Sequence, residues 1–243
     1  MTNLQQIYES TRRIFVPTDA EKAFISFDFS QLEMRILAHL SGDEKMKKVF
    51  GSNGDIHQYA ASVIFDVPAE EVTQEMRKIA KEINFAMITG ASAHAVSREL
   101  GIEKAKIKDY IAKHAEHFSE AASYLEKLVE TAREKGYVRT ILGRKRNLSN
   151  IDSRNKNMRS SAEKGAISFA VSGSAADIIK KTMVDVFEGV ARTHRDMHLM
   201  LQVREEILIE TRKRRVEKYS NDLRNLMENV VKLSVPIAVR VSE

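Results

Sequence analysis

Apolar positions alternate with polar ones near both ends of the chain, whereas the middle follows a helical period. The early segment Lys-Ala-Phe-Ile-Ser-Phe-Asp-Phe is rich in aromatic and β-branched residues, which is typical of a strand. Two later alternating segments are separated only by Arg204 and Glu205, which predicts a tight hairpin. The predicted strands are 22–29, 197–203, 206–211 and 235–241. We expect an α+β fold in which a four-stranded antiparallel sheet is interrupted by a helical subdomain.

Helical spacing of apolar residues begins directly after the first strand and returns through most of the chain. Ser30 is a plausible N-cap for the first helix, and Thr73 for a later one. Helices are predicted throughout 56–135, over 153–194 with a split near Gly173, and over 213–232. His114 and His117 are expected at the surface of a helix.

Composition limits the chemistry available. The 243 residues include no cysteine, so any metal must bind oxygen or imidazole. A formal charge of +5 permits a polyanionic partner without requiring one. No apolar run reaches membrane-spanning length, and the first residues carry no apolar signal segment. We therefore expect no membrane partner and a cytoplasmic location.

Three carboxylates lie at predicted strand ends. Asp28 ends the first strand, and Glu205 and Glu206 lie at the hairpin. If the strands are neighbours, the acids converge and favour Mg²⁺, which takes oxygen ligands. The alternative is that all three belong to ordinary solvated turns.

Arg77 and Lys81 lie four residues apart on one helical stripe, where they could hold phosphates. The alternative is a solvated helix face on which these cations pair with nearby glutamates. The candidate partners are Glu70, Glu71 and Glu75.

Six short motifs, in order along the chain, resemble those of family A (DNA polymerase I-like) polymerases. They begin with Asp-Phe-Ser-Gln-Leu-Glu-Met-Arg at 28–35, similar to motif A, and end with Gln-Val-Arg-Glu-Glu at 202–206, similar to motif C. Between them stand Asp-Ile-His at 55–57, the motif B spacing from Arg77 to Gly90, Gly-Arg-Lys-Arg at 143–146 and Ala-Ala-Asp-Ile at 175–178. Asn3-Leu4-Gln5 resembles the segment that leads into the palm.

The resemblance implies a right-hand palm, an antiparallel sheet with helices, and a largely helical fingers subdomain. The expected boundaries are palm 1–45, fingers 46–150 and palm 151–243. Thumb and exonuclease domains are expected to be absent. The implied partners are primer–template DNA and deoxynucleoside triphosphates, for a monomer associated with the nucleoid in DNA replication and repair.

The resemblance also implies roles for individual residues. Catalysis falls to Asp28, Glu205 and Glu206, and the ligands of two Mg²⁺ ions, replaceable by Mn²⁺, are Asp28, the Phe29 carbonyl and Glu205. The implied nucleotide-binding residues are Phe29, Gln31, Glu33, His57, Arg77, Lys81, Phe85 and Thr89. The implied DNA-binding residues are Arg144, Arg146, Lys164, Ser168, Ser172 and Arg204.

Several of these positions depart from the family pattern. Glu205 replaces an Asp and Arg204 a His in motif C, and Ala86 and Thr89 replace a Gly and a Tyr in motif B. Lys164, Ser168 and Ser172 replace an Arg, an Asn and a Gln that contact template–primer. The expected function is template-directed DNA synthesis with reduced activity. The alternative is a weak or inactive polymerase-like scaffold that binds DNA or nucleotide.

Overall fold

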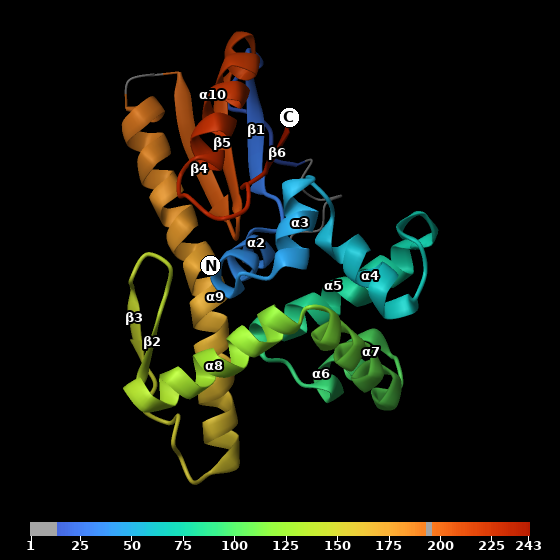
Figure 1. Cartoon of the computed structure of the whole chain (residues 1–243). Coiled ribbons are helices and arrows are strands. Elements are labelled where there is room, and N and C mark those ends of the chain that lie inside the picture. The colour runs from blue at the N-terminus through green and yellow to red at the C-terminus, as the bar shows by residue number, and fades with distance from the viewer. Residues whose placement is uncertain (1–13, 193–195) are drawn as a thin grey trace. The chain divides into compact units, whose positions relative to one another are not determined.

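A computed structural model describes residues 14–192 and 196–243 (Figure 1). The resemblance at Asn3-Leu4-Gln5 lies outside the described residues. The chain divides into two compact units, of which the first combines the N-terminal part up to Leu32 with Ala175–Lys232 and Ile237–Glu243. The second comprises Glu33–Ser174 and Leu233–Pro236. None of the helices in the described ranges is long and apolar enough to cross a membrane.

The first unit is built on an antiparallel sheet whose strand order is β4-β5-β1-β6. The strands are β1 (Lys22–Phe29), β4 (Met197–Val203), β5 (Glu206–Arg212) and β6 (Val239–Ser242). Every second residue of β1 is buried, as the alternating sequence predicts. The predicted α+β class, the four-stranded sheet and the hairpin are confirmed.

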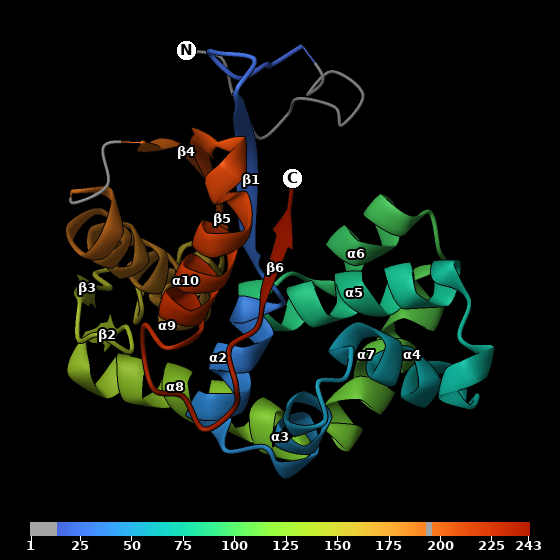
Figure 2. The same ribbon diagram turned by 90° about the horizontal axis from the view of Figure 1, so that it is seen from above.

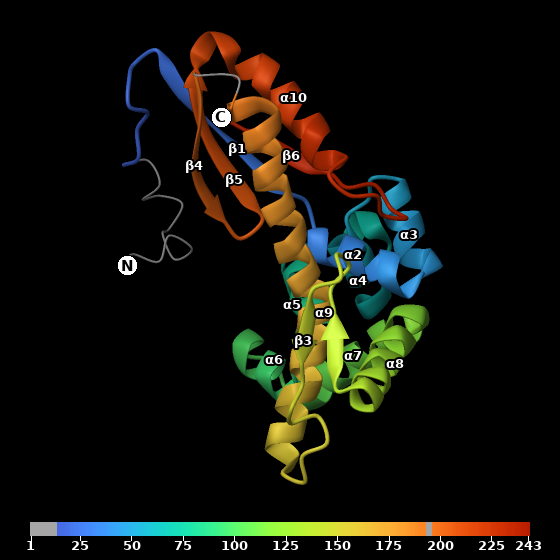
Figure 3. The same ribbon diagram turned by 90° about the vertical axis from the view of Figure 1, so that its left-hand side faces the viewer.

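Helices complete this unit. After the short η4 (Lys213–Arg215), α10 (Val216–Glu228) buries Tyr219, Leu223 and Met227 along one stripe, and it contacts β1 and β6 (Figure 3). The end of α9 (Lys156–Val186) continues into a π-helical turn, η3 (Phe187–Ala191), which contacts β4. The sheet is therefore held by an amphipathic helix whose apolar stripe has the 3.6-residue period.

The second unit is mainly helical. Its helices are α2 (Leu32–Ser41), α3 (Glu44–Gly51), α4 (Ile56–Phe65), η2 (Ala69–Glu71), α5 (Gln74–Thr89), α6 (Ala93–Leu100), α7 (Lys104–His117), α8 (Ser119–Lys135) and the first part of α9. A small hairpin joins β2 (Tyr137–Arg139) and β3 (Lys145–Asn147). Figure 2 shows α5, α6 and α7 grouped together, where Ala86, Val96 and Ile107 form a buried cluster.

Caps fix where several of these helices begin. The Thr73 hydroxyl accepts a bond from the Met76 amide at 3.2 Å, so its predicted capping role is confirmed. Asp55 caps α4 by accepting from the amides of His57 at 2.8 Å and Gln58 at 3.2 Å. These caps determine which residues occupy the first turns of α4 and α5.

Three predicted boundaries are wrong. Helix α9 runs through Gly173 without a break, because packing rather than glycine propensity decides there. Helix α2 begins at Leu32, directly after Gln31 with a left-handed φ of 55°, so Ser30 lies one residue too early to be its cap. The last strand begins only at Val239, because the preceding segment bonds elsewhere: the Pro236 carbonyl accepts a bond from Arg35 Nη1 at 2.5 Å.

The prediction that His114 lies at the surface is also wrong. Its side chain is only 2% exposed, in α7, whereas His117 one turn later is partly exposed. His114 is buried because its ring lies 4.8 Å from the Phe118 ring and Nε2 lies 2.7 Å from Asn84 Oδ1. A buried imidazole with a polar partner is stable where an unpaired one would not be.

Candidate active site

Two of the predicted catalytic acids are direct neighbours in the sheet. Asp28 at the end of β1 is paired in register with Glu206 at the start of β5. Directly opposed residues of an antiparallel pair project to the same face with Cβ atoms roughly 5 Å apart. The carboxylates of Asp28 and Glu206, far apart in sequence, therefore lie side by side because β1 and β5 are neighbours in the sheet, which was the condition for the predicted convergence.

Glu205 belongs to the turn between β4 and β5. Its carbonyl accepts a bond from the Phe29 amide at 3.2 Å, which ties the turn to the end of β1. Arg204, beside it, has a left-handed φ of 53° and is exposed, and its carbonyl accepts a bond from Gln202 Nε2. The motif C turn is thus held by a backbone bond to the end of β1 and by a side-chain bond within the turn.

Two further residues modify this acidic edge. Ser26, one pleat back on the same face, donates a hydrogen bond from its hydroxyl to Glu206 Oε1 at 2.6 Å. Arg240 on β6 is the register partner of Asp28 on its other side. The sequence analysis missed Arg240, because nothing in the sequence states which strand lies beside the first one.

The donor set suits magnesium chemically. Within the described part of the chain, no three acidic or histidine side chains gather as a metal site would require. Mg²⁺, however, is commonly held by one or two carboxylates together with water and substrate phosphates. The paired carboxylates of Asp28 and Glu206, with the nearby Phe29 carbonyl and Glu205, offer oxygen ligands of this kind.

The second cluster of candidate residues lies in the helical unit. Arg77 on α5 donates to Asp55 Oδ2 from Nε at 2.8 Å and from Nη2 at 2.6 Å. Burial raises the pKa of Asp55, but the bonds from Arg77 and from the amides of Gln58 and His57 outweigh it, so the net pKa is lowered. Arg77 therefore pairs with Asp55 and not with any of the glutamates considered from the sequence.

Lys81 and Phe85 continue the stripe of Arg77. Lys81 is exposed, and its Nζ lies 5.5 Å from the centre of the half-buried Phe85 ring. The His57 ring lies 6.0 Å from the same ring. The structure thus brings together a cation, an aromatic face and an imidazole, as expected of a nucleotide site.

Burial controls the charge of His57. Desolvation lowers its pKa to about 4, and the positive charges of Arg77 and Lys81 act in the same direction against the opposing effect of Asp55. Asn84 Nδ2 lies 2.9 Å from His57 Nδ1, a contact that the sequence analysis missed. Near neutral pH the imidazole is therefore uncharged, and it can act only as a hydrogen-bonding group.

The remaining residues predicted to bind nucleotide lie at the end of α5 and at the start of α2. The exposed Thr89 donates its hydroxyl bond to the Phe85 carbonyl at 2.7 Å. Gln31 and Glu33 lie on either side of the first residue of α2 and are partly exposed. The roles of Thr89, Gln31 and Glu33 in nucleotide binding stay predictions.

The predicted DNA-binding cations of the helical unit lie around β3 and α9. The Arg144 guanidinium lies 4.7 Å from the Phe169 ring centre and donates to the Gly173 carbonyl at 2.9 Å, and Arg146 lies 5.6 Å from the same ring. Lys164 is exposed on α9, whereas Ser168 and Ser172 are partly buried there. Arg204 belongs to the sheet unit.

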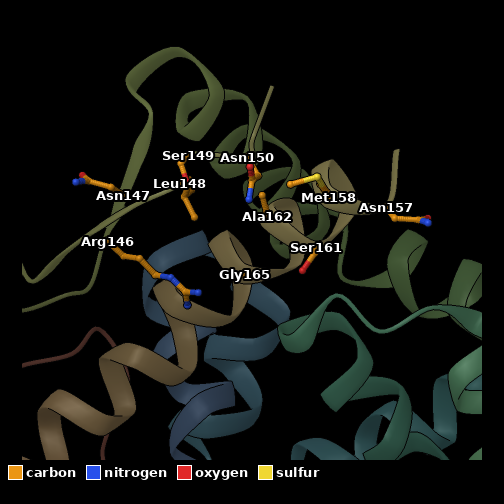
Figure 4. Close-up of a pocket in the computed structure, with 10 residues that line it drawn as sticks. All are labelled: Arg146, Asn147, Leu148, Ser149, Asn150, Asn157, Met158, Ser161, Ala162 and Gly165. Atoms are coloured by element: carbon orange, nitrogen blue, oxygen red, sulfur yellow. The ribbon is translucent and has the colours of Figure 1, made fainter. Parts of the chain in front are cut away.

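A polar hollow of about 430 Å³ lies beside this region (Figure 4). Arg146 and Gly165 border it, with several amide and hydroxyl side chains and no carboxylate. Its lining residues are Arg146, Asn147, Leu148, Ser149, Asn150, Asn157, Met158, Ser161, Ala162 and Gly165. A cation among neutral donors suits an anionic group such as a phosphate.

Comparison with known proteins decides the family. The model described as DNA polymerase family A matches residues 1–243. The chain belongs to DNA polymerase family A. Similar family A proteins include DNA polymerase I of Bacillus caldotenax, 38% identical over 94% of this chain and 26% of that protein. The thermostable DNA polymerase I of Thermus aquaticus is 38% identical over 98% of this chain and 29% of its own length.

A solved family A structure gives the same result in three dimensions. The polymerase domain of Pol1 from M. smegmatis, in complex with DNA primer-template and dNTP, matches with a TM-score of 0.91 and 35% identity. The match covers 98% of this chain and 43% of that one. The chain spans less than a third of the length of the two DNA polymerase I proteins, from Bacillus caldotenax and Thermus aquaticus.

Proposed function

We propose that this chain is the catalytic core of a template-directed DNA polymerase, adding deoxynucleotides to a primer 3′ end. The observation that carries the proposal is the register pairing of Asp28 with Glu206 at the strand ends of a family A sheet. The likeness to a domain that holds primer-template and dNTP supports the same partners here. Such a protein would act on chromosomal DNA in the nucleoid.

Asp28, Glu205 and the Phe29 carbonyl are proposed to hold two Mg²⁺ ions, with Glu206 beside them. When bound, such ions supply charge stabilisation for an in-line phosphoryl displacement. The task of the chain's own residues is to hold the carboxylates in place. The bond from Ser26 to Glu206 and the backbone bond from Phe29 to Glu205 serve that purpose.

Residues 46–150 are proposed as fingers, and 1–45 with 151–243 as palm. In the fingers, His57, Arg77 and Lys81 would bind the triphosphate, because its charge needs cations and hydrogen-bond donors. Phe85 would stack on the incoming base, since a flat ring accepts any base. Phe29, Gln31, Glu33 and Thr89 would complete nucleotide binding, with Glu33 sensing the sugar 2′ position.

We propose that the DNA is held mainly through phosphate contacts. The residues assigned to it are Arg144, Arg146, Lys164, Ser168, Ser172 and Arg204. All four cations are exposed, near β3, on α9 and in the motif C turn, as phosphate contacts require. Ser168 and Ser172 offer only short hydroxyls, so they would contribute less than the cations.

We propose that activity is reduced. Glu205 is one methylene longer than the Asp of the family pattern, which displaces its oxygens by roughly 1.5 Å. Misplacing a reacting group on that scale costs about a hundredfold in rate. Arg204 and Arg240 place two cations next to the acids, which weakens cation binding there.

A second candidate function follows from the position of Arg240. With Arg240 beside Asp28, the fold would serve as a scaffold that binds DNA or nucleotide without extending a primer. The two functions differ in one measurable product, the extended primer.

Primer extension with Mg²⁺, and in parallel with Mn²⁺, tests the proposal. We expect slow extension by the parent chain and none by Asp28→Asn, with the melting temperature nearly unchanged because Asp28 is only partly buried. Asp109→Asn, an exposed aspartate on α7, is the matched control and should extend like the parent. Extension by Asp28→Asn at the parent rate would remove the metal-dependent role, and no extension by any form would favour the scaffold.

A further inference from the structure

A buried polar chain links three helices of the second unit. His57 on α4, Asn84 on α5 and His114 on α7 are 5%, 0% and 2% exposed. Asn84 Nδ2 lies 2.9 Å from His57 Nδ1, and Asn84 Oδ1 lies 2.7 Å from His114 Nε2. One side-chain amide therefore joins two imidazoles by its opposite ends.

The orientation of the Asn84 amide, with Nδ2 towards His57 and Oδ1 towards His114, assigns the ring protons. The amide nitrogen of Asn84 can only donate, so His57 Nδ1 must accept and carries no proton. The amide oxygen can only accept, so His114 Nε2 must carry a proton and donate. His114 thereby orients the amide, and the amide selects the tautomer of His57.

Both rings hold a single proton near neutral pH. Burial lowers the pKa of each to about 4. The nearby charges do not reverse this, since Arg77 and Lys81 lower the pKa of His57 against Asp55, and His117 lowers that of His114. With Nδ1 bare, the one proton of His57 is on Nε2.

The Nε2 atom of His57 is free to meet a ligand. It makes no hydrogen bond within the described residues, and no fully buried side-chain nitrogen or oxygen there lacks a partner. Nε2 is therefore not completely enclosed, on a ring that lies 6.0 Å from the Phe85 ring. It is a neutral hydrogen-bond donor next to the α5 stripe.

We propose that Asn84 and His114 are positioning residues that lock His57 in the Nε2–H form, so that it donates to an anionic phosphate oxygen of the incoming nucleotide. The nucleotide part of this inference rests on the proposed function, whereas the proton positions do not. The opposite tautomer would present a lone pair to the phosphate and repel it. Selection of the tautomer thus converts a buried neutral imidazole into a phosphate-binding group.

Nitrogen-15 NMR of the imidazoles in the whole chain at neutral pH tests the proton positions without nucleotide or DNA. We expect His57 with bare Nδ1 and protonated Nε2, and His114 with protonated Nε2. A protonated His57 Nδ1, or rapid averaging between its two tautomers, would overturn the proposal. This outcome is readable in the parent protein even if a variant does not fold.

Variants test whether Asn84 and His114 control the tautomer of His57. Asn84→Asp has nearly the same shape but only accepts, so His57 Nδ1 should become protonated. His114→Gln retains a donor and should leave the His57 tautomer locked, whereas His114→Leu should release it into a mixture. His117→Gln is the matched control, because His117 bonds to Tyr59 and not to Asn84. An unchanged His57 spectrum in both Asn84→Asp and His114→Leu would overturn the proposal.

Kinetics separate this inference from the proposed function. If the chain extends primers, His114→Leu should raise the KM for dNTP by about tenfold, the loss expected for a bond to a charged group, with a smaller effect on kcat. His114→Gln should restore the parent KM. If no form extends primers, the polymerase proposal fails while the NMR result still decides the tautomer. If NMR shows the tautomer locked in the parent, but His114→Leu leaves the KM for dNTP unchanged, only the phosphate-binding part of the proposal would be removed.

Discussion

At the scale of single residues, two lysines of α5 allow nucleotide binding by the α5 stripe to be tested. Lys81 and Lys78 are both exposed lysines of α5, but only Lys81 lies over the Phe85 ring. Lys78 is rotated about 100° from Arg77 around the helix axis. The two lysines therefore form a matched pair: they have the same charge and lie on the same helix, but their side chains project from different sides of it.

We expect Lys81→Ala to weaken dNTP binding by about tenfold and Lys78→Ala by less than about twofold. Loss of a hydrogen bond to a charged group costs about 1.5–3 kcal/mol, while an exposed charge farther away contributes little. Fluorescence titration of labelled dNTP with each variant measures the difference. Equal losses in the two variants would mean that α5 presents an ordinary charged surface.

Residues also show where sequence reasoning stops. The convergence of Asp28 and Glu206 was predicted only for the case in which their strands are neighbours, because a two-residue hairpin sets the register of β4 with β5 and not that of β1 with β5. Arg240 beside Asp28 was not, since strand order is a property of the whole sheet. The burial of His114 was not predictable either, because its partner Asn84 lies on another helix.

At the scale of elements, the end of α5 depends on one glycine. Gly90 ends the helix with a φ of 66°, and a Cβ there would lie 2.9 Å from Lys164 Cγ and 3.2 Å from Lys164 Cα on α9. Gly101 ends α6 with a φ of 67° and has no atom within 4 Å of the same position. The two glycines share a backbone conformation but differ in their surroundings.

We expect Gly90→Ala to lower the free energy of unfolding by about 2–5 kcal/mol and Gly101→Ala by about 1–2 kcal/mol. The left-handed conformation costs a side chain roughly 1–2 kcal/mol in both, and overpacking against α9 adds about 1–3 kcal/mol in the first. Urea unfolding measures both. Similar losses would show that α9 can move away from α5 without cost.

Strand β5 carries a buried carboxylate at the end away from the motif C turn. Glu210 is 2% exposed and accepts bonds from the Thr18 amide at 2.6 Å, the Thr18 hydroxyl at 2.9 Å and Lys22 Nζ at 2.9 Å. Burial raises the pKa of Glu210, but the bonds from Thr18 and Lys22 outweigh it and lower the pKa below the ordinary 4.5. The ionised form is therefore the one that stabilises the fold.

We expect Glu210→Gln to destabilise the chain by about 1–3 kcal/mol near neutral pH, because the bonds to an ionised acceptor are lost. A lowered folded pKa gives stability that is complete above the unfolded value of about 4.5 and is lost as the pH falls through the folded pKa. Urea unfolding of both forms at about pH 7 and about pH 3.5 should therefore show the difference shrinking in acid. A difference that stays constant would place the effect in packing instead.

The elements also show why some boundaries were missed. Gly173 suggested a break, yet α9 continues through it. A Cβ at this position would lie only 3.2 Å from Thr140 Cγ2 and 3.3 Å from Phe169 Cδ2. Its small size serves close packing, and the Arg144 side chain bonds to its carbonyl. A glycine that permits close approach and one that ends a helix look alike in a sequence.

At the scale of the whole molecule, one sheet is assembled from the two ends of the chain. Strand β1 comes before the helical insertion, and β4, β5 and β6 come after it. The period change from two to 3.6 residues made this interruption predictable. The division of the chain at Leu32 and at Ala175 was not, because α9 crosses the second boundary as one continuous helix.

Substitutions in the motif C turn test primer extension, which is an activity of the whole protein. If Arg204 and Glu205 limit catalysis, Arg204→His with Glu205→Asp should raise primer extension by about a hundredfold, the cost assigned to a ligand displaced by roughly 1 Å. The shorter acid returns its oxygens towards Asp28, and removal of a permanent cation restores the negative potential that holds divalent ions. Histidine also tolerates the left-handed φ of 53° found at Arg204.

The single changes separate the two causes. Glu205→Asp alone should help less, because the Arg204 cation would still compete for the carboxylates, and Mn²⁺ should partly rescue the parent. Steady-state extension at fixed DNA and dNTP, with binding measured for each variant, gives the comparison. A double variant that binds both partners yet extends nothing would show that the defect lies outside the turn. Arg240, register-paired with Asp28, would then be the next residue to replace, and the scaffold function would gain support.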